Sequence, residues 1–197
     1  VMAKKLHPDH AHCISMALTP MTLTARLIKH EHPNAKVVFI GPCAAKKLEA
    51  MRKSVRSEVD FVLTFEELQA LFDSRDIDLK SLPEGVLDNA SYYGRIFARS
   101  GGLSDAVTQA LKEQGLDQTF ELKAIACDGI EACRMALLKA SKKVLPANFI
   151  EGMACIGGCI GGAGCLTHGD KNKADVDKYG MEAMEKTITD AIGVLKK

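Results

Sequence analysis

Residues 151–165 (EGMACIGGCIGGAGC) combine three cysteines with six glycines, and this composition is the strongest chemical signal in the sequence. Cys155 and Cys159 are four residues apart, so both thiolates could bind one centre. Thiolate ligands select zinc, copper(I) or iron–sulfur clusters, and glycines let backbone amides approach a cluster and donate hydrogen bonds to it. The spacing favours an iron–sulfur cluster over zinc, which more often uses paired C-x-x-C. A phosphate-binding glycine loop with incidental cysteines is the alternative.

A further cysteine, Cys43, follows a β-branched run at residues 36–40 (KVVFI). Such a run is typical of a buried parallel strand. Another strand begins at residues 148–150 and leads to Cys155. Ligands of parallel sheets bind beyond the carboxyl ends of the strands, so two strand ends that lead to cysteines indicate a site. Taken alone, a single cysteine after a strand is more often a small buried apolar residue than a ligand.

Apolar and amphipathic segments predict the elements that would position these residues. Strands are expected at residues 36–40, 60–64, 121–127 and from 148 onward, and helices at 1–6, 21–29, 44–51, 65–72, 103–113, 130–141 and 181–195. Thr64 and Glu67 fit a capping box at the start of the helix over 65–72. Strands that alternate with helices predict an α/β fold with a mainly parallel four-stranded sheet flanked by helices. We expect this fold to be one lobe of a two-lobed domain.

Length and composition exclude several classes of protein. The 197 residues are 47% hydrophobic and 26% charged, which are globular proportions rather than those of a disordered or fibrous chain. A formal net charge of +1 predicts no basic face for nucleic acid. No apolar run approaches the roughly 18 residues that span a bilayer, and residues 1–15 lack the apolar core of a secretory signal. Seven cysteines in such a chain predict a cytoplasmic protein with thiols or metal ligands rather than disulfides.

Two segments carry a resemblance to a known family. Residues 41–49 (GPCAAKKLE) resemble the second signature of the iron-only ([FeFe]) hydrogenases, M-P-C-x-x-K-x-x-E. Residues 151–162 (EGMACIGGCIGG) resemble the third signature, E-x-M-x-C-x-G-G-C-x-x-G-G, and match every fixed position up to its last glycine, where the sequence has Ala163. Residues 60–68 (DFVLTFEEL) are also similar to the family. The resemblance therefore extends over nearly the whole chain.

The resemblance implies an active centre in which a [4Fe–4S] cluster is joined through one cysteine to a diiron site with CO and CN ligands. It implies that Cys43, Cys155 and Cys159 are three of the four ligands of the cluster, with Cys159 bridging to the diiron site. We therefore expect these three sulfurs, which are far apart along the chain, to gather at one edge of the fold.

The resemblance also assigns roles to four other residues. Lys46 corresponds to a lysine that hydrogen-bonds a cyanide, which suits an ammonium beside an anionic ligand. Met153 corresponds to a methionine that packs against the diiron site, and Glu49 to a structural carboxylate. Thr19 corresponds to a hydroxyl position in the proton path. Without the resemblance, Lys46 would be interpreted as part of an ordinary charged helix face.

Two departures from the family pattern affect these expectations. The first signature, T-S-C-C-P, which would supply the fourth ligand of the cluster and a proton-transfer cysteine, does not occur in the sequence. We therefore expect residues 1–197 to be the C-terminal lobe of the cluster-binding domain, inactive alone and without a complete cluster. Gly41 replaces a methionine of the catalytic members, which resembles the hydrogen-sensing branch of the family.

The resemblance thus predicts part of a protein that interconverts H2 with protons and electrons. Its expected partners are H2, protons and a ferredoxin-like electron carrier or fused cluster or signalling domains, without nucleic acid or membrane. A hydrogen sensor and an iron–sulfur assembly protein of the same superfamily are the alternatives, together with a zinc-binding or cluster-free interaction lobe. The remaining candidates are expected to be structural: Cys127 and Cys133 in the core or on a helix, Cys165 without a role, and Cys13 and His168 at the surface.

Overall fold

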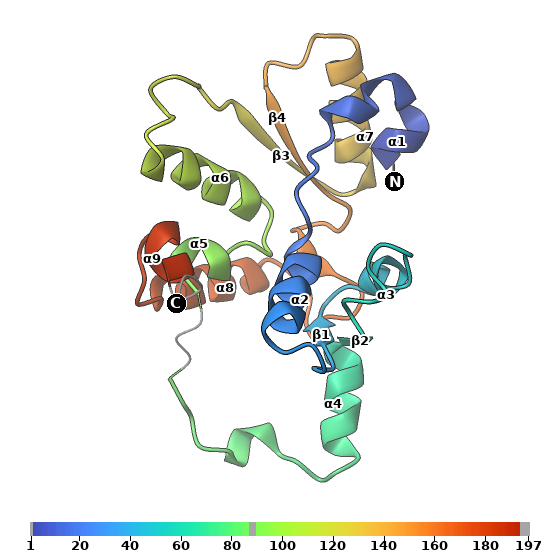
Figure 1. Cartoon of the computed structure of the whole chain (residues 1–197), viewed down its shortest axis with the longest axis vertical. Coiled ribbons are helices and arrows are strands. Elements are labelled where there is room, and N and C mark those ends of the chain that lie inside the picture. The colour runs from blue at the N-terminus through green and yellow to red at the C-terminus, as the bar shows by residue number, and fades with distance from the viewer. Residues whose placement is uncertain (1, 87–89, 194–197) are drawn as a thin grey trace. The chain divides into compact units, whose positions relative to one another are not determined.

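The computed structural model describes residues 2–86 and 90–193 (Figure 1). The chain divides into two compact units. Unit 1 consists of Val1–Ala11, Glu84–Gly161 and Thr167–Lys197, and unit 2 consists of His12–Pro83 and Gly162–Leu166. Each unit contains one pair of parallel strands.

Unit 2 contains helices α2 (Pro20–Glu31), α3 (Ala45–Ala50) and α4 (Phe65–Asp73), strands β1 (Val38–Gly41) and β2 (Phe61–Thr64), and the 3-10 turn η2 (Leu79–Ser81). Its core is formed by Met21, Ala25, Val55 and Val59, with Phe39 and Val62 packed against them. Phe39 and Val62 are register partners of β1 and β2, so one face of this sheet covers the core. Val38 and Ile40, at the alternate positions of β1, are 45% and 43% exposed. The strand is therefore covered on one face only, and the expectation of a fully buried strand is wrong at these two positions.

Two helices of unit 2 begin at threonine caps. The Thr64 side chain accepts a hydrogen bond from the Glu67 N–H, and the Glu67 carboxylate accepts one from the Thr64 N–H. This reciprocal pair confirms the predicted capping box. Thr19 caps α2 by accepting from the Thr22 N–H at 3.4 Å, and Pro20 suits the first helical position because its missing N–H needs no partner there.

Unit 1 contains the helices α1 (Met2–Leu6), α5 (Tyr92–Arg95), α6 (Gly102–Glu113), α7 (Ile130–Ser141), α8 (Lys171–Met181) and α9 (Ile188–Gly193). It also contains the strands β3 (Ala124–Asp128) and β4 (Phe149–Met153) and the 3-10 turn η3 (Cys159–Gly161). The 3-10 turn η1 (Pro8–Cys13) crosses the division between the units. Cys127, Cys133 and Ala136 form its core cluster, against which Ile125 and Ile150 pack. The prediction that both cysteines are structural is confirmed, since both are buried.

The α/β class and the parallel strands are confirmed, but the single four-stranded sheet is wrong. The structure contains two two-stranded parallel sheets, β1-β2 and β3-β4. Apolar runs identify strands, but the partner of each strand depends on the path of the chain between them. Within each pair the connection includes one helix, α3 or α7, whereas the long segment 65–123 between β2 and β3 forms α4, α5 and α6.

The predicted helix over 181–195 is also wrong in its bounds. Met181 ends α8, which begins at Lys171, and a separate helix α9 begins at Ile188; residues 194–195 lie outside the described part of the chain. Glu113 of α6 fixes this second start, because its carboxylate accepts hydrogen bonds from the N–H groups of Ile188 and Thr189 at 2.9 and 2.8 Å. These contacts are tertiary, so the local pattern did not contain them.

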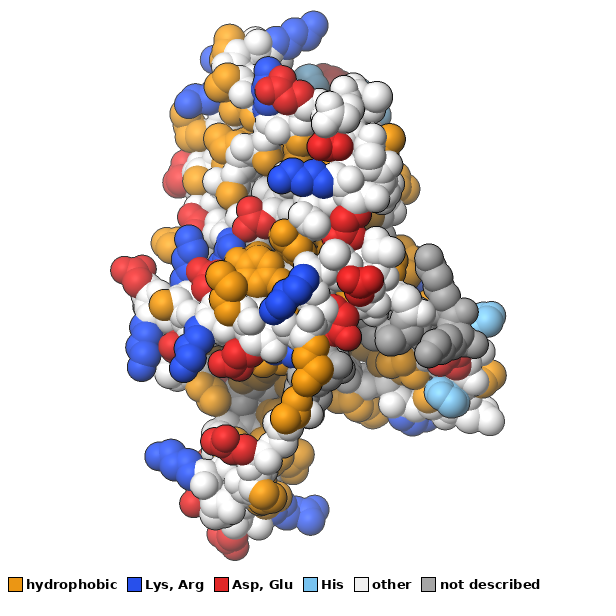
Figure 2. Space-filling model, turned by 90° about the vertical axis from the view of Figure 1, so that its left-hand side faces the viewer, with side chains coloured by type: hydrophobic (Ala, Val, Ile, Leu, Met, Phe, Trp, Pro, Cys, Tyr) orange, Lys and Arg blue, Asp and Glu red, His pale blue; other side chains and the backbone are white. Residues whose placement is uncertain are grey.

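The surface agrees with the balanced composition. On the face drawn in Figure 2, Lys and Arg side chains are interspersed with Asp and Glu. Among the described residues, the structure contains no helix with the length and apolar character needed to cross a membrane.

Candidate functional site

The glycine–cysteine loop begins where β4 ends, at the carboxyl edge of the unit 1 sheet. Asp128 and Met153 are register partners, so β3 and β4 end side by side. The Gly158 N–H donates to the Cys155 carbonyl at 3.1 Å and closes a tight turn. Gly157 occupies the third position of this turn with φ 81°, a conformation that type II turns reserve for glycine. The spacing between the two cysteines is therefore a defined turn.

A neighbouring segment holds this turn through the backbone. The Ser100 N–H donates to the Gly157 carbonyl at 2.9 Å, and Gly158 forms an isolated antiparallel bridge with Arg99. A Cβ atom at Gly158 would lie 2.5 Å from the Ser100 nitrogen and 2.8 Å from the Ala98 carbonyl oxygen. Glycine is therefore required at Gly158 because another backbone passes too close for any side chain.

Two carboxylates of unit 1 support the same region. Glu151 on β4 is only 1% exposed, and its carboxylate accepts hydrogen bonds from the Gly101 N–H, the Ser104 N–H and the Ser104 hydroxyl at 2.7–2.8 Å. This links β4 to the N-terminus of α6. Asp128, at the end of β3, accepts a hydrogen bond from the Gly157 N–H at 2.7 Å.

Arg99 anchors the segment that contacts the turn. Its side chain is 11% exposed and donates to Asp177 at 2.5 Å, to Asp105 at 2.9 Å and to the Ser100 carbonyl at 3.2 Å. Burial alone would lower the pKa of this guanidinium, but the hydrogen bonds to the two carboxylates raise it. Arg99 is thus a permanent cation that connects α6 and α8 to residues 99–100.

Glu151, Asp128 and Arg99 are not among the residues to which the sequence assigns a role. Glu151 was visible only as a fixed position of the third signature, and its acidic side chain within an apolar strand was a usable signal of a buried, hydrogen-bonded carboxylate. Asp128 follows the third predicted strand directly, which is where functional side chains of parallel sheets occur. Arg99 lay in a segment without a clear period and gave no comparable signal.

In unit 2, the structure brings Thr19, Lys46 and Glu49 together. The Lys46 Nζ lies 2.7 Å from Glu49 Oε2, and the Thr19 hydroxyl donates to Glu49 Oε1 at 2.5 Å. The Thr22 hydroxyl is a third donor to Glu49 Oε1, at 3.4 Å. Glu49, six residues after Cys43, therefore joins α2 to α3, and its carboxylate fixes the ammonium of Lys46.

The charge of Glu49 is stabilised by these partners. Burial alone would raise the pKa of this carboxyl, but the hydrogen bonds from Lys46 and Thr19 and the positive charges of Lys46 and Arg52 lower it below its usual value. Glu49 is consequently ionised at neutral pH. The role of Glu49 as a structural carboxylate stays a prediction.

The environments of the cysteines differ. Cys43, Cys155 and Cys159 are half-buried, whereas Cys13 is exposed. Burial raises the pKa of the thiols of Cys127 and Cys133, which disfavours the thiolate form needed for metal binding.

The remaining candidate residues differ in how far they are exposed. Cys165 is buried in unit 2, and His168 is exposed, as expected. Met153 is half-buried at the end of β4. Within either unit, the described residues contain no group of three or more His, Cys, Asp or Glu side chains that could hold a metal ion.

The three predicted cluster ligands belong to different units. Cys43 lies in unit 2, and Cys155 and Cys159 lie in unit 1. The chain enters unit 2 again at Gly162, three residues after Cys159, and the Gly164 N–H donates to the Pro42 carbonyl at 3.1 Å. This hydrogen bond lies within unit 2, where it joins residues 162–166 to the residue before Cys43. The gathering of the three sulfurs at one edge stays a prediction.

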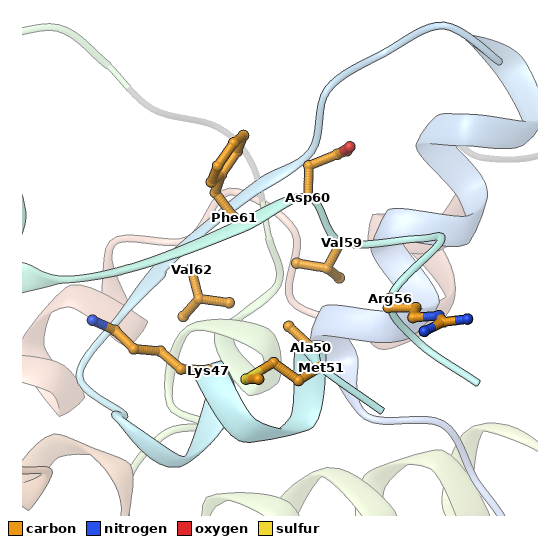
Figure 3. A pocket seen from close by; sticks show the side chains of 8 residues that line it. All are labelled: Lys47, Ala50, Met51, Arg56, Val59, Asp60, Phe61 and Val62. Atoms are coloured by element: carbon orange, nitrogen blue, oxygen red, sulfur yellow. The ribbon is translucent and has the colours of Figure 1, made fainter. Parts of the chain in front are cut away.

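The pocket in Figure 3 is separate from these residues. It has a volume of about 460 Å³ and lies in unit 2 between α3 and β2. Its lining is formed by Lys47, Ala50, Met51, Arg56, Val59, Asp60, Phe61 and Val62. None of the predicted ligands is among them, so this pocket is not the candidate site.

The site therefore consists of parallel strands that lead into half-buried cysteines, with a glycine turn between two of these cysteines, in an α/β fold. A family model described as "Iron only hydrogenase large subunit, C-terminal domain" matches residues 1–163. The chain belongs to this family. This confirms the resemblance carried by residues 41–49 and 151–162.

Individual relatives agree with this assignment. The chain is 28% identical to the periplasmic [Fe] hydrogenase large subunit of Nitratidesulfovibrio vulgaris, over 89% of this chain and 47% of that protein. It is also 28% identical to the cytosolic Fe-S cluster assembly factor NAR1 of Eremothecium gossypii, over 85% of this chain and 50% of the relative. The chain thus spans about half the length of these relatives.

Solved structures support the fold. The [FeFe]-hydrogenase HydA1 from Chlamydomonas reinhardtii superimposes with a TM-score of 0.72 at 19% identity, over 99% of this chain and 68% of that chain. A second [FeFe]-hydrogenase structure, concerned with oxygen inactivation, gives a TM-score of 0.71 at 20% identity, over 99% of this chain and 66% of that one.

Proposed function

We propose that this chain is the C-terminal lobe of an iron-only hydrogenase-like protein that interconverts H2 with protons and electrons. The observation that carries the proposal is the turn between Cys155 and Cys159, at the carboxyl ends of two parallel strands, with glycines at the two positions where only glycine fits. A loop that bound phosphate through its amides would not need two half-buried thiols at these positions.

The residues present fit a [4Fe–4S] cluster with a diiron site. Cys43, Cys155 and Cys159 would hold the cluster, with Cys159 bridging to the diiron site, because they are half-buried thiols outside the apolar core. When bound, this group supplies the electron storage and the polarisation of hydrogen. Cys127 and Cys133 are poor ligands by contrast, because burial raises the pKa of their thiols.

Three further residues would act beside the cluster. Lys46 would donate to a cyanide ligand, and Glu49 orients its ammonium through the 2.7 Å ion pair. Thr19 stays a predicted residue of the proton path, and its hydroxyl proton points at Glu49 Oε1. Met153, at the end of β4, would pack against the diiron site.

The proposed surroundings follow from the same assignment. A ferredoxin-like carrier or fused cluster or signalling domains would exchange electrons, and no nucleic acid or membrane is needed. We propose a cytoplasmic location, although the names of the relatives include both a periplasmic and a cytosolic protein. This chain alone should be inactive and lack a complete cluster, because three cysteines cannot close a four-cysteine site.

The test compares this chain with the full-length protein, each expressed with the enzymes that assemble the diiron site and purified without oxygen. We expect infrared CO and CN bands and hydrogen evolution only in the full-length protein. Cys159→Ser should remove the bands, whereas Cys13→Ser, a change at an exposed cysteine, should not. Full-length protein with bound iron but without CO and CN bands would contradict the hydrogenase proposal. Turnover by residues 1–197 alone would contradict their inactivity.

A hydrogen-sensing role is the second candidate, and Gly41 favours it. A Cβ atom at Gly41 would lie 2.8 Å from Cε1 of the Phe39 ring, so this ring occupies the space that the methionine of the catalytic members would need. A sensor should keep the CO and CN bands but turn over hydrogen far more slowly than a catalytic enzyme. The NAR1 relative makes an iron–sulfur assembly role the third candidate, which predicts cubane clusters without these bands.

A further inference from the structure

The turn between Cys155 and Cys159 is stabilised by backbone hydrogen bonds. Its internal hydrogen bond joins the Gly158 N–H to the Cys155 carbonyl, and the Ser100 N–H binds the carbonyl of Gly157. The N–H of Gly157, at the centre of the turn, takes no part in these two hydrogen bonds and needs an acceptor of its own. The structure provides one side chain for it.

That acceptor is Asp128. Its Oδ2 lies 2.7 Å from the Gly157 nitrogen, a short distance for a hydrogen bond between an amide and an oxygen, as is typical of a charged acceptor. Asp128 is the last residue of β3 and the register partner of Met153 in β4. The acceptor is therefore carried by a strand of the sheet rather than by a mobile loop.

The residue after Asp128 also lies near the turn. Gly129 directly follows Asp128 with φ 81°, and a Cβ atom there would lie 3.4 Å from Cγ1 of Ile156. Ile156 lies inside the turn, between Cys155 and Gly157. The turn is thus hydrogen-bonded to Asp128, and there is little space between Ile156 and Gly129 for an added side chain.

We propose that Asp128 is a positioning residue that fixes the turn so that the thiols of Cys155 and Cys159 can bind one metal centre. This rests on the proposed function only in the identity of that centre. The shape of the turn is a property of unit 1, because Asp128 and residues 155–159 all belong to this unit. Partners of metal-binding segments have this effect on affinity because they restrict the ligands to one geometry.

The experiment uses the full 197-residue chain, reduced and without iron. Phenylarsine oxide is the probe, since its arsenic binds two thiols of one molecule and releases one water, so it reports whether Cys155 and Cys159 can close on a single atom. Mass spectrometry locates the bound arsenic, and Cys155→Ser is the control that removes this site. Hydrogen exchange of the Gly157 amide is the second measurement.

Asp128→Ala should weaken arsenical binding at Cys155 and Cys159 about tenfold and speed Gly157 exchange about fivefold. Asp128→Asn retains an acceptor oxygen in the same place without the charge, and should restore both values to within about twofold. This rescue separates positioning from a general loss of stability. Tyrosine fluorescence checks that both variants remain folded, because all three tyrosines, Tyr92, Tyr93 and Tyr179, lie in unit 1.

Equal binding and exchange in Asp128→Ala and the unchanged protein would overturn the proposal, and so would the absence of arsenic at these two thiols in the unchanged protein. Neither readout depends on iron, CO or CN. The proposed function can therefore fail in the infrared experiment while Asp128 keeps its assigned role. Conversely, the role of Asp128 can fail in the arsenical and exchange measurements while the infrared bands support the proposed function.

Discussion

The two units hold their candidate residues in different ways. In unit 1 the turn at Cys155–Gly158 is fixed by backbone contacts and by a hydrogen bond to Asp128, and the fully buried Glu151 binds Gly101 and Ser104 at the start of α6. In unit 2 the residues after Cys43 are held by an ion pair between side chains that are 21% and 17% exposed, Lys46 and Glu49. Buried hydrogen bonds are costly to break, whereas pairs that reach solvent are weakened by salt and acid. Unit 1 should therefore be sensitive to shape and unit 2 to charge.

The largest expected effect comes from Glu151→Ala. The substitution leaves the N–H groups of Gly101 and Ser104 without their carboxylate, which should lower the unfolding free energy of unit 1 by about 3 kcal/mol. Tyrosine fluorescence in a urea titration measures this unit alone, since all three tyrosines belong to it. Glu182→Ala, at an exposed carboxylate of the same unit, should change the midpoint little. Equal losses in both variants would show that the buried carboxylate is not what stabilises unit 1.

A substitution in the turn tests the role of shape directly. Gly158→Ala combines φ 88° with a collision against the Ser100 backbone, and should cost about 2–3 kcal/mol. Gly115→Ala is the matched control, because Gly115 also has a positive φ of 67° but open space where the Cβ would be, and should cost about 1 kcal/mol. The difference between the two variants in the same urea titration isolates the close approach. If they cost the same, backbone conformation alone explains the glycine.

The charge-sensitive unit is tested by Glu49→Gln. The glutamine keeps an acceptor for Thr19 but loses the ion pair with Lys46, so unit 2 should lose about 1 kcal/mol at pH 7. The folded-state pKa of Glu49 lies below the usual 4.5, so its stabilisation is complete above about pH 4.5 and disappears as the pH falls through the lowered value. Thermal unfolding followed by methyl NMR signals of β1 and β2 should show the two proteins converging in acid.

The control for this effect is a double-mutant cycle. In a Lys46→Met background, Glu49→Gln should cost less than it does alone, because the partner charge is already gone. Raising the salt concentration should shrink the Glu49→Gln effect but leave the Glu151→Ala effect unchanged. Equal salt dependence in the two variants would break the distinction between the units.

The smallest effect is expected for Lys36→Ala. The Lys36 side chain is 79% exposed and lies 3.3 Å from Asp60, so its loss should change the stability of unit 2 by less than about 0.5 kcal/mol. Lys29 binds the same carboxylate at 2.8 Å, with only 19% of its side chain exposed, and also donates to the Ser57 carbonyl. Its hydrogen bond is the main reason that the pKa of Asp60 lies well below the usual range. Lys29→Ala should therefore cost more than Lys36→Ala in the same NMR measurement.

Local sequence was a good guide to the elements. The β-branched runs correspond to β1–β4 within a few residues, and the capping box at Thr64 and Glu67 formed as predicted, because both signals depend on neighbours along the chain. The helix over 181–195 was misplaced because its start at Ile188 depends on Glu113, which is far away in sequence. The four-stranded sheet failed for the same reason, since the pairing of strands is decided by long-range contacts.

The sequence by itself determined the kind of chemistry available: thiols four residues apart, glycines between them, and a lysine and a carboxylate after Cys43. It did so because the side chains that bind metals are few and their local spacing is part of the binding. Only the tertiary structure decided which groups restrain these residues, namely Asp128 on the Gly157 amide, Glu151 under α6, and Thr19 on Glu49. These partners are 29, 47 and 30 positions apart in the sequence, so only folding brings them into hydrogen-bond distance.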